Sequence, residues 1–178
     1  MTLNFCTEQK KDYYKVYYLI KEAFKSDPNS GHNEQDLVVL LRKSDKFIPE
    51  LSITAKEGER VVGYILLSPI EIINRENANS ALVLAPLVVD PNYQNQGIGS
   101  KLINFAHSRA IQAGYNSIAV IGHENYYPKF GYELASKYSI SFPFETPDVY
   151  CMIKELTPRA LNNVYGMVAY PEAFYQYQ

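Results

Sequence analysis

Residues 84–99 constrain the fold of this chain more than any other stretch. The segment begins as an apolar run rich in β-branched residues, which predicts a buried strand. Asp90 and Pro91 end that strand, because proline has no amide hydrogen to give to a β-ladder. Gly97 and Gly99 then open an amphipathic helix, whose first amides have no partner inside the helix and bind anions readily. The segment therefore predicts a strand, a turn and a helix that together hold a phosphate group.

Three glycine-rich signatures compete for this turn. A dinucleotide fingerprint needs a glycine before Gly97 that is missing, and a P-loop needs lysine before serine, whereas Ser100 precedes Lys101 here. The pattern that does stand is Gln94-x-x-Gly97-x-Gly99. It resembles the acyl-CoA pyrophosphate loop of the GNAT superfamily of N-acetyltransferases, whose signature is Gln or Arg, two residues, Gly, one residue, and Gly or Ala. An ordinary β–α turn with a capping glycine is the alternative.

A second match lies further along the chain. Residues 118–122 form another short apolar strand, and Tyr127-x-x-x-Gly131-Tyr132 follows it. In GNAT proteins the strand after the pyrophosphate helix leads into a short helix with a tyrosine four residues before Gly-Phe or Gly-Tyr. The run Tyr-Tyr-Pro-Lys-Phe-Gly at 126–131 resembles one bacterial branch of the superfamily. The resemblance covers most of residues 1–170 and is sharpest over 84–132.

The fold class that follows is α/β, of the α+β kind, with strands and helices alternating after a hairpin. We expect strands near 3–6, 51–56, 60–73, 81–89, 118–122 and 149–156, helices near 11–23, 35–42 and 97–112, and a short helical turn at 158–164. The resemblance implies a GNAT-like mixed, mostly antiparallel sheet flanked by helices, with splayed central strands. It also implies a single N-acetyltransferase domain over 1–178, with its core at 3–170.

Composition excludes several classes of function. The net charge is −2 and the sequence pI is about 5.9, which argues against a nucleic-acid partner bound by a basic face. No apolar run reaches the length of a membrane span, and the widely spaced Cys6 and Cys151 favour free thiols in a cytoplasmic protein. Three scattered histidines do not indicate a metal site. A homodimer is left open.

The resemblance implies acetyl-CoA as the co-substrate and no metal. In that family the loop amides bind the pyrophosphate and the strand before the loop pairs, through its main chain, with the pantetheine arm. Gln94 would shape the turn, Ser100 would offer a hydroxyl, and Asn125 would bind the arm; simple core packing of the strand is compatible with this role. The predicted donor-binding residues are Leu87, Val88, Val89, Gln94, Asn95, Gln96, Gly97, Ile98, Gly99, Ser100 and Asn125.

Acetyl transfer to an amine also needs an acid and a base. Tyr127 matches the family's general acid, since a phenol titrates near 10 and is protonated at neutral pH; a packing role is the alternative, with Tyr126 as a fallback. Many members carry a glutamate near the start of the loop strand, where residues 81–84 have no carboxylate. His123 is the candidate base, because imidazoles titrate near 6.5. Glu71, Glu124 and a water relay remain in competition with it.

The leading interpretation is an acyl-CoA-dependent N-acetyltransferase. It moves acetyl from acetyl-CoA to a primary amine, on a small molecule or a peptide, by direct transfer in a ternary complex. No cysteine lies near the motif, so a covalent relay is not indicated. A longer-chain acyltransferase and a non-catalytic acyl-CoA-binding module are the alternatives. The acceptor would be set by residues 23–42, the strand ends and the 136–149 loop.

Overall fold

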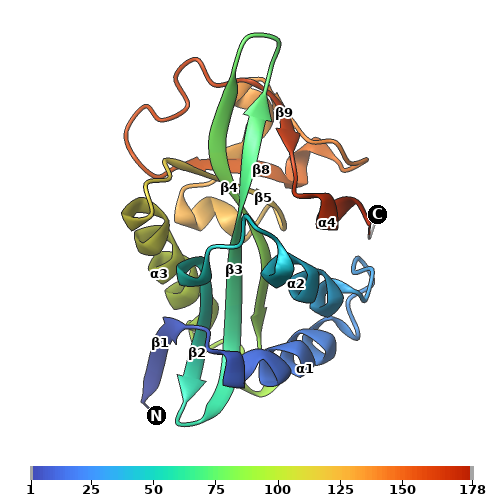
Figure 1. Ribbon diagram of the computed structural model, residues 1–178, viewed down its shortest axis with the longest axis vertical. Coiled ribbons are helices and arrows are strands. Elements are labelled where there is room, and N and C mark those ends of the chain that lie inside the picture. The colour runs from blue at the N-terminus through green and yellow to red at the C-terminus, as the bar shows by residue number, and fades with distance from the viewer. Residues whose placement is uncertain (1, 177–178) are drawn as a thin grey trace.

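The computed structural model describes residues 2–176 and builds them around a nine-stranded sheet (Figure 1). The strand order is β1-β2-β3-β4-β5-β8-β6, with β9 paired to β3 and β7 paired to β9. The strands are β1 (Leu3–Thr7), β2 (Ser52–Glu57), β3 (Arg60–Ile73), β4 (Ala78–Val89), β5 (Ser117–Ile121), β6 (Glu133–Leu134), β7 (Ile140–Ser141), β8 (Cys151–Glu155) and β9 (Gly166–Ala169). The α-helices are α1 (Tyr13–Phe24), α2 (Glu34–Lys43), α3 (Ile98–Gln112) and α4 (Glu172–Tyr175).

The sheet is mixed and mostly antiparallel, which confirms the predicted fold class. The parallel contact between β4 and β5 is confined to Leu82 opposite Ile118 and Val83 opposite Ala119. After this contact β4 continues to Val89 along β3 alone, so the two central strands separate. A bulge in the β3–β4 pairing falls at the same level, between the Leu67–Leu84 and Ile65–Leu87 pairs. The separation leaves main-chain groups of β4 without a partner strand on the β5 side.

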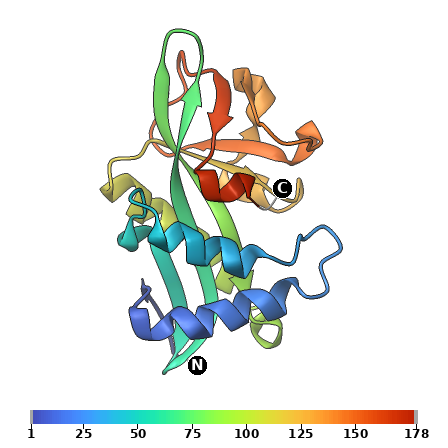
Figure 2. The ribbon, with the colours of Figure 1, turned by 45° about the vertical axis from the view of Figure 1, so that its right-hand side comes forward.

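Helices cover both faces of the sheet (Figures 1 and 2). On one face α1 and α2 place Val16, Ile20 and Val38 against Tyr64 of β3. On the other face α3 packs apolar side chains against alternate residues of β2 to β5, and these helix residues are Ile98, Leu102, Ile103, Ala106 and Ala110. Two cores on opposite faces of one sheet hold the ends of β4 and β5 in place around the gap between them.

Two buried ion pairs attach the first helices to the edge of the sheet. Arg42 of α2 binds the carboxylate of Glu8, and both side chains are almost fully buried. The Nζ of Lys56 on β2 lies 2.5 Å from Asp12, which precedes α1. Burial raises the pKa of Glu8, although Arg42 and Ser52 act in the opposite direction. These pairs fix where α1 and α2 cross the sheet.

The structure corrects parts of the expected pattern. Within α3 the apolar Ile111 is 47% exposed, whereas the polar His107 is buried and bonded to the hydroxyl of Tyr132 at 2.9 Å. Positions 98, 102, 106 and 110 of the helix face the sheet, and residue 107 is buried because it lies next to this face. Residues 158–164 form hydrogen-bonded turns without a helix, and β9, which was not predicted, follows them. No helix among residues 2–176 is both long enough and apolar enough to span a membrane.

Candidate active site

The turn between β4 and α3 has the geometry of an anion-binding loop. Asn95 and Gly97 adopt left-handed conformations, with φ of 61° and 76°. The side-chain amide of Gln94 donates to the carbonyl of Val89 at 3.3 Å, which ties the turn back to the end of the strand. Ile98 is buried under the sheet and anchors the first turn of the helix. The exposed turn thus presents unpaired helix amides on a fixed backbone.

Asp90 braces the entry to this loop. Its carboxylate accepts from the amide of Asn92 and from Arg60, each at 2.9 Å, at the short 3₁₀ helix η3 (Pro91–Tyr93). Burial acts to raise the pKa of Asp90, but the Asn92 and Arg60 bonds outweigh it and hold the pKa below its ordinary value. Arg60 also lies over the ring of Tyr93 at 5.1 Å. The segment between strand and helix is therefore held by β3 as well as by its own turn.

A cleft of about 1260 Å³ opens between the separated strands. It unites most of the predicted site: the residues that line it include Leu87, Val89, Gln94, Asn95, Gly97, Ile98, Gly99, Ser100, His123 and Tyr127. Val88, Gln96 and Asn125 are not among its lining residues. The side chain of Val88 points into the core beneath α1 and α2, because successive residues of a strand face opposite sides. Gln96 and Asn125 are exposed to solvent.

Tyr127 is the first residue of the short 3₁₀ helix η4 (Tyr127–Phe130), which follows β5 in the chain. Its ring covers Gly122 so closely that a Cβ there would be 2.2 Å from Cε2 of Tyr127. The ring also packs against Tyr126 and Tyr132, with centroid separations of 5.2 and 5.5 Å. Burial raises the pKa of Tyr127, so the phenol stays protonated across the physiological range. A glycine is thus required at 122 for the position of this ring.

Tyr126 joins the two sequence motifs. Its hydroxyl lies beside Ser100, and a Cβ on Gly99 would lie 2.7 Å from that hydroxyl oxygen. The Nζ of Lys129 lies above the Tyr126 ring, 4.2 Å from its centroid. Tyr126 was expected only as a substitute acid, and Lys129 was not expected in the site. The doubled tyrosine of the motif was the available signal, but which ring faces the helix depends on the path of η4.

The carboxylates that line the cleft differ from those that the sequence motifs indicated. Asp27, Glu34 and Glu145 line it, whereas Glu71 and Glu124 do not. Glu71 is exposed on the far part of β3, where the strand pairs with β9. His123 lines the cleft with an exposed side chain. Residues 2–176 contain no group of three or more His, Cys, Asp or Glu arranged to hold a metal ion.

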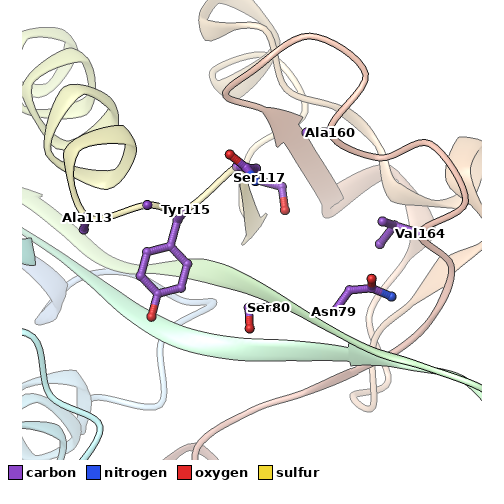
Figure 3. A pocket seen from close by; sticks show the side chains of 9 residues that line it. Asn79, Ser80, Ala113, Tyr115, Ser117, Ala160 and Val164 are labelled. Atoms are coloured by element: carbon purple, nitrogen blue, oxygen red, sulfur yellow. The ribbon is translucent and has the colours of Figure 1, made fainter.

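A second pocket, of about 430 Å³, lies at the opposite end of α3. Figure 3 shows Tyr115 and Ser117 on one side of it, with Asn79 and Ser80 of β4 on the other. None of the predicted site residues lines this pocket, and its lining among the described residues includes no carboxylate, histidine, lysine or arginine. The chemistry of the chain is therefore concentrated in the larger cleft.

Comparisons with known proteins agree with this geometry. The model of the Acetyltransferase (GNAT) family matches residues 13–132. The uncharacterized N-acetyltransferase YhbS of Escherichia coli K12 is 30% identical over 156 residues, covering 88% of this chain and 89% of YhbS. A crystal structure of E. coli YhbS in complex with CoA has a TM-score of 0.87 at 28% identity, covering 97% of this chain and 92% of that one. A GNAT family acetyltransferase from Brucella melitensis in complex with acetyl-CoA has a TM-score of 0.80 at 26% identity, covering 97% and 98%. This chain belongs to the acetyltransferase (GNAT) family.

Proposed function

We propose that this protein is an acyl-CoA-dependent N-acetyltransferase that moves acetyl from acetyl-CoA to a primary amine in a ternary complex. The observation that carries the proposal is the shared cleft, which joins the amide-bearing turn at 95–99 to the phenol of Tyr127. The two structural relatives with the same fold are described in complex with CoA and with acetyl-CoA, which supports the choice of donor.

The lining residues fit that donor. A diphosphate would be held by the free amides of the first turn of α3, with the Ser100 hydroxyl beside them. Lys129 adds positive charge next to this turn, since its Nζ lies over the Tyr126 ring that contacts Ser100. The unpaired edge of β4 at Leu87–Val89 is available to pair with the amides of a pantetheine arm, as the family resemblance implies. The pantetheine arm would bind to backbone groups of β4, so the Val88 side chain can pack in the core without preventing this pairing.

The bound thioester would supply the electrophilic carbonyl, and the chain would supply orientation and proton control. As the amine nitrogen bonds to the carbonyl carbon, the carbon–sulfur bond breaks and negative charge collects on sulfur. Tyr127 is neutral, buried and inside the cleft, so its hydroxyl can donate a hydrogen bond to that sulfur. Its raised pKa keeps the proton on the phenol while the carbon–sulfur bond breaks, so the hydroxyl stabilises the departing thiolate by donating a hydrogen bond.

The amine must lose a proton before or during attack. We assign the role of accepting this proton to His123, whose imidazole lines the cleft on the side of β5. The exposed position of this side chain connects it to solvent, which can carry the proton away. A chain of waters without His123 is the competing route, and the pH profile described in the Discussion separates the two.

The test measures thiol release from acetyl-CoA with a panel of primary amines, together with CoA affinity by calorimetry. Tyr127→Phe removes one oxygen and keeps the ring, so kcat should fall by about 10- to 10³-fold with unchanged CoA affinity. Gly99→Val should instead weaken CoA binding, because its side chain would press on the Tyr126 hydroxyl and cover the loop amides. Turnover that is unchanged by Tyr127→Phe, with chemistry rate-limiting, would refute the assigned acid. Donor affinity unchanged in a folded Gly99→Val protein would refute the loop assignment.

A further inference from the structure

His107 and Tyr132 form a buried polar pair inside an apolar core. Nε2 of His107, in the second half of α3, lies 2.9 Å from the hydroxyl of Tyr132, which follows the tight turn at Gly131. Tyr132 is 2% exposed and belongs to the core that α3 forms with the sheet, and His107 is 9% exposed. A hydroxyl buried in such a core needs a hydrogen-bond partner, and within residues 2–176 His107 is the partner that it has.

Both members of this pair are neutral at physiological pH. Burial and the charge of Lys154 lower the pKa of His107 to about 4, and burial raises the pKa of Tyr132 well above its ordinary value. Neither group therefore gains or loses a proton near pH 7. The hydrogen bond contributes geometry, because it fixes the place of the Tyr132 ring.

The Tyr132 ring in turn packs on Tyr127. The two ring centroids lie 5.5 Å apart with an interplanar angle of 74°, which is an edge-to-face contact. Tyr126 makes the other contact of this kind with Tyr127, at 5.2 Å, but Tyr126 is only half-buried. The buried side of the Tyr127 ring is thus bounded by Tyr132, and a displacement of Tyr132 passes directly to Tyr127.

Helix α3 holds the tyrosine segment at two levels. At the start of the helix the Tyr126 hydroxyl lies beside Ser100, and seven residues later His107 holds Tyr132. At 1.5 Å per residue, these two levels are about 10 Å apart along the helix. Tyr127 packs against both tyrosines, so the helix that opens with the donor loop also sets the place of this ring.

Resting on the proposed function, we propose that His107 is a positioning residue for acetyl transfer, which holds Tyr132 so that Tyr132 keeps the phenol of Tyr127 in place. Neither His107 nor Tyr132 lines the cleft, so neither touches the donor or the acceptor. Loss of the hydrogen bond should therefore lower kcat and leave the binding of both substrates nearly unchanged, because only the reacting group moves.

Four variants separate this role from a merely structural one. Tyr132→Phe removes the hydroxyl alone, His107→Leu removes the imidazole, and His107→Gln keeps an amide that can bond to the hydroxyl. Tyr64→Phe is the matched control. The Tyr64 hydroxyl is also buried and lies 2.8 Å from the hydroxyl of Ser52, but it belongs to the core on the opposite face of the sheet and does not line the cleft.

The kinetic experiment measures thiol release with saturating acetyl-CoA and the amine of the panel that is turned over fastest. We expect Tyr132→Phe and His107→Leu to lower kcat by about tenfold, with the KM for the amine and the affinity for CoA within about twofold of the wild type. His107→Gln should recover most of the loss. Tyr64→Phe should lower the Tm as Tyr132→Phe does and leave kcat unchanged. In the Tyr127→Phe background, Tyr132→Phe should cost less than about twofold, since the hydroxyl that it positions is already gone.

A spectroscopic measurement on Tyr127 needs no turnover. With 3-fluorotyrosine at position 127, the ¹⁹F resonance reports the surroundings of that ring. His107→Leu should shift or broaden this resonance, and it should add no further change in the Tyr132→Phe background, because its effect passes through the Tyr132 hydroxyl. Tyr64→Phe should leave the resonance where it is.

The outcomes distinguish this inference from the proposed function. A kcat that falls in Tyr127→Phe but not in Tyr132→Phe or His107→Leu would overturn the positioning role and leave the acid in place. A loss in Tyr132→Phe that is equally large in the Tyr127→Phe background would overturn the role as well. If no amine is turned over, the proposed reaction fails and the ¹⁹F resonance decides: a change caused by His107→Leu through Tyr132 supports the positioning of Tyr127, and an unchanged resonance overturns it.

Discussion

Replacing Gly122 with alanine should displace the ring of Tyr127 and so impair its role in catalysis, although the tyrosine itself is unchanged. The backbone at Gly122 is not left-handed, so alanine is acceptable there in conformation and the whole effect is steric. The added Cβ would lie 2.2 Å from Cε2 of Tyr127, whereas ordinary contact begins at 3.4 Å. The ring must therefore move by about 1.2 Å, or the end of β5 must move with it. The ring has little room, because Tyr126 and Tyr132 pack on it with their edges or faces.

The magnitude follows from that displacement. A misplacement of about 1 Å in a catalytic group costs roughly 10²-fold in rate, so we expect kcat to fall by about that factor. Overpacking should destabilise the fold by about 1–3 kcal/mol, which is roughly 2–12 °C in Tm for a chain of this length. The affinity for CoA should fall less than kcat, since the Gln94–Val89 hydrogen bond that ties the loop to β4 does not involve Tyr127.

The assay is thiol release at saturating acetyl-CoA, with calorimetry for CoA and thermal unfolding for stability. The decisive measurement is the double variant with Tyr127→Phe. If Gly122 acts by positioning the phenol, Gly122→Ala should lower kcat much less in the Tyr127→Phe background than in the wild type. Full additivity of the two losses would refute the positioning role, and an unchanged kcat in a folded Gly122→Ala protein would refute the assignment of Tyr127 itself.

Three further outcomes follow from the structure. Arg42→Met should cost about 3–5 kcal/mol in urea unfolding because it strands the buried Glu8 carboxylate, and adding Glu8→Gln should recover much of the loss; equal stability of both variants would contradict this. Burial and the charge of Lys154 lower the pKa of His107 to about 4, so the folded protein favours the neutral imidazole. The free energy of unfolding should therefore fall as the pH drops from about 6.5 toward 4, by about 2 kcal/mol at pH 5. The His107→Asn variant should lack this part of the pH dependence in urea unfolding. His123→Ala should remove the acidic limb of the kcat/KM profile, whereas a limb that survives and moves with the basicity of the amine would assign the proton to water.

The local elements were readable because their causes are local. Pro91 ends a strand wherever it stands, and the left-handed conformation of Gly97 suits the glycine found there. Apolar periodicity placed α1, α2 and α3 within a few residues of their bounds. The phase of α3 was less secure, since His107 looks polar in sequence and is buried only because Tyr132 comes to meet it. A residue whose burial depends on one distant partner carries no local signal.

The sequence by itself determined the strand–turn–helix at 84–99 and the tyrosine motif at 126–132, because backbone preference and spacing act over a few residues. Only the tertiary structure decided how these segments meet: the separation of β4 from β5, the contact of Tyr126 with Gly99, and the cleft that Glu34 and Glu145 both line. Each of these joins residues more than twenty positions apart. Their proximity follows from strand order and from which face each helix covers, and those are set by burying two apolar cores at once rather than by any single stretch of chain.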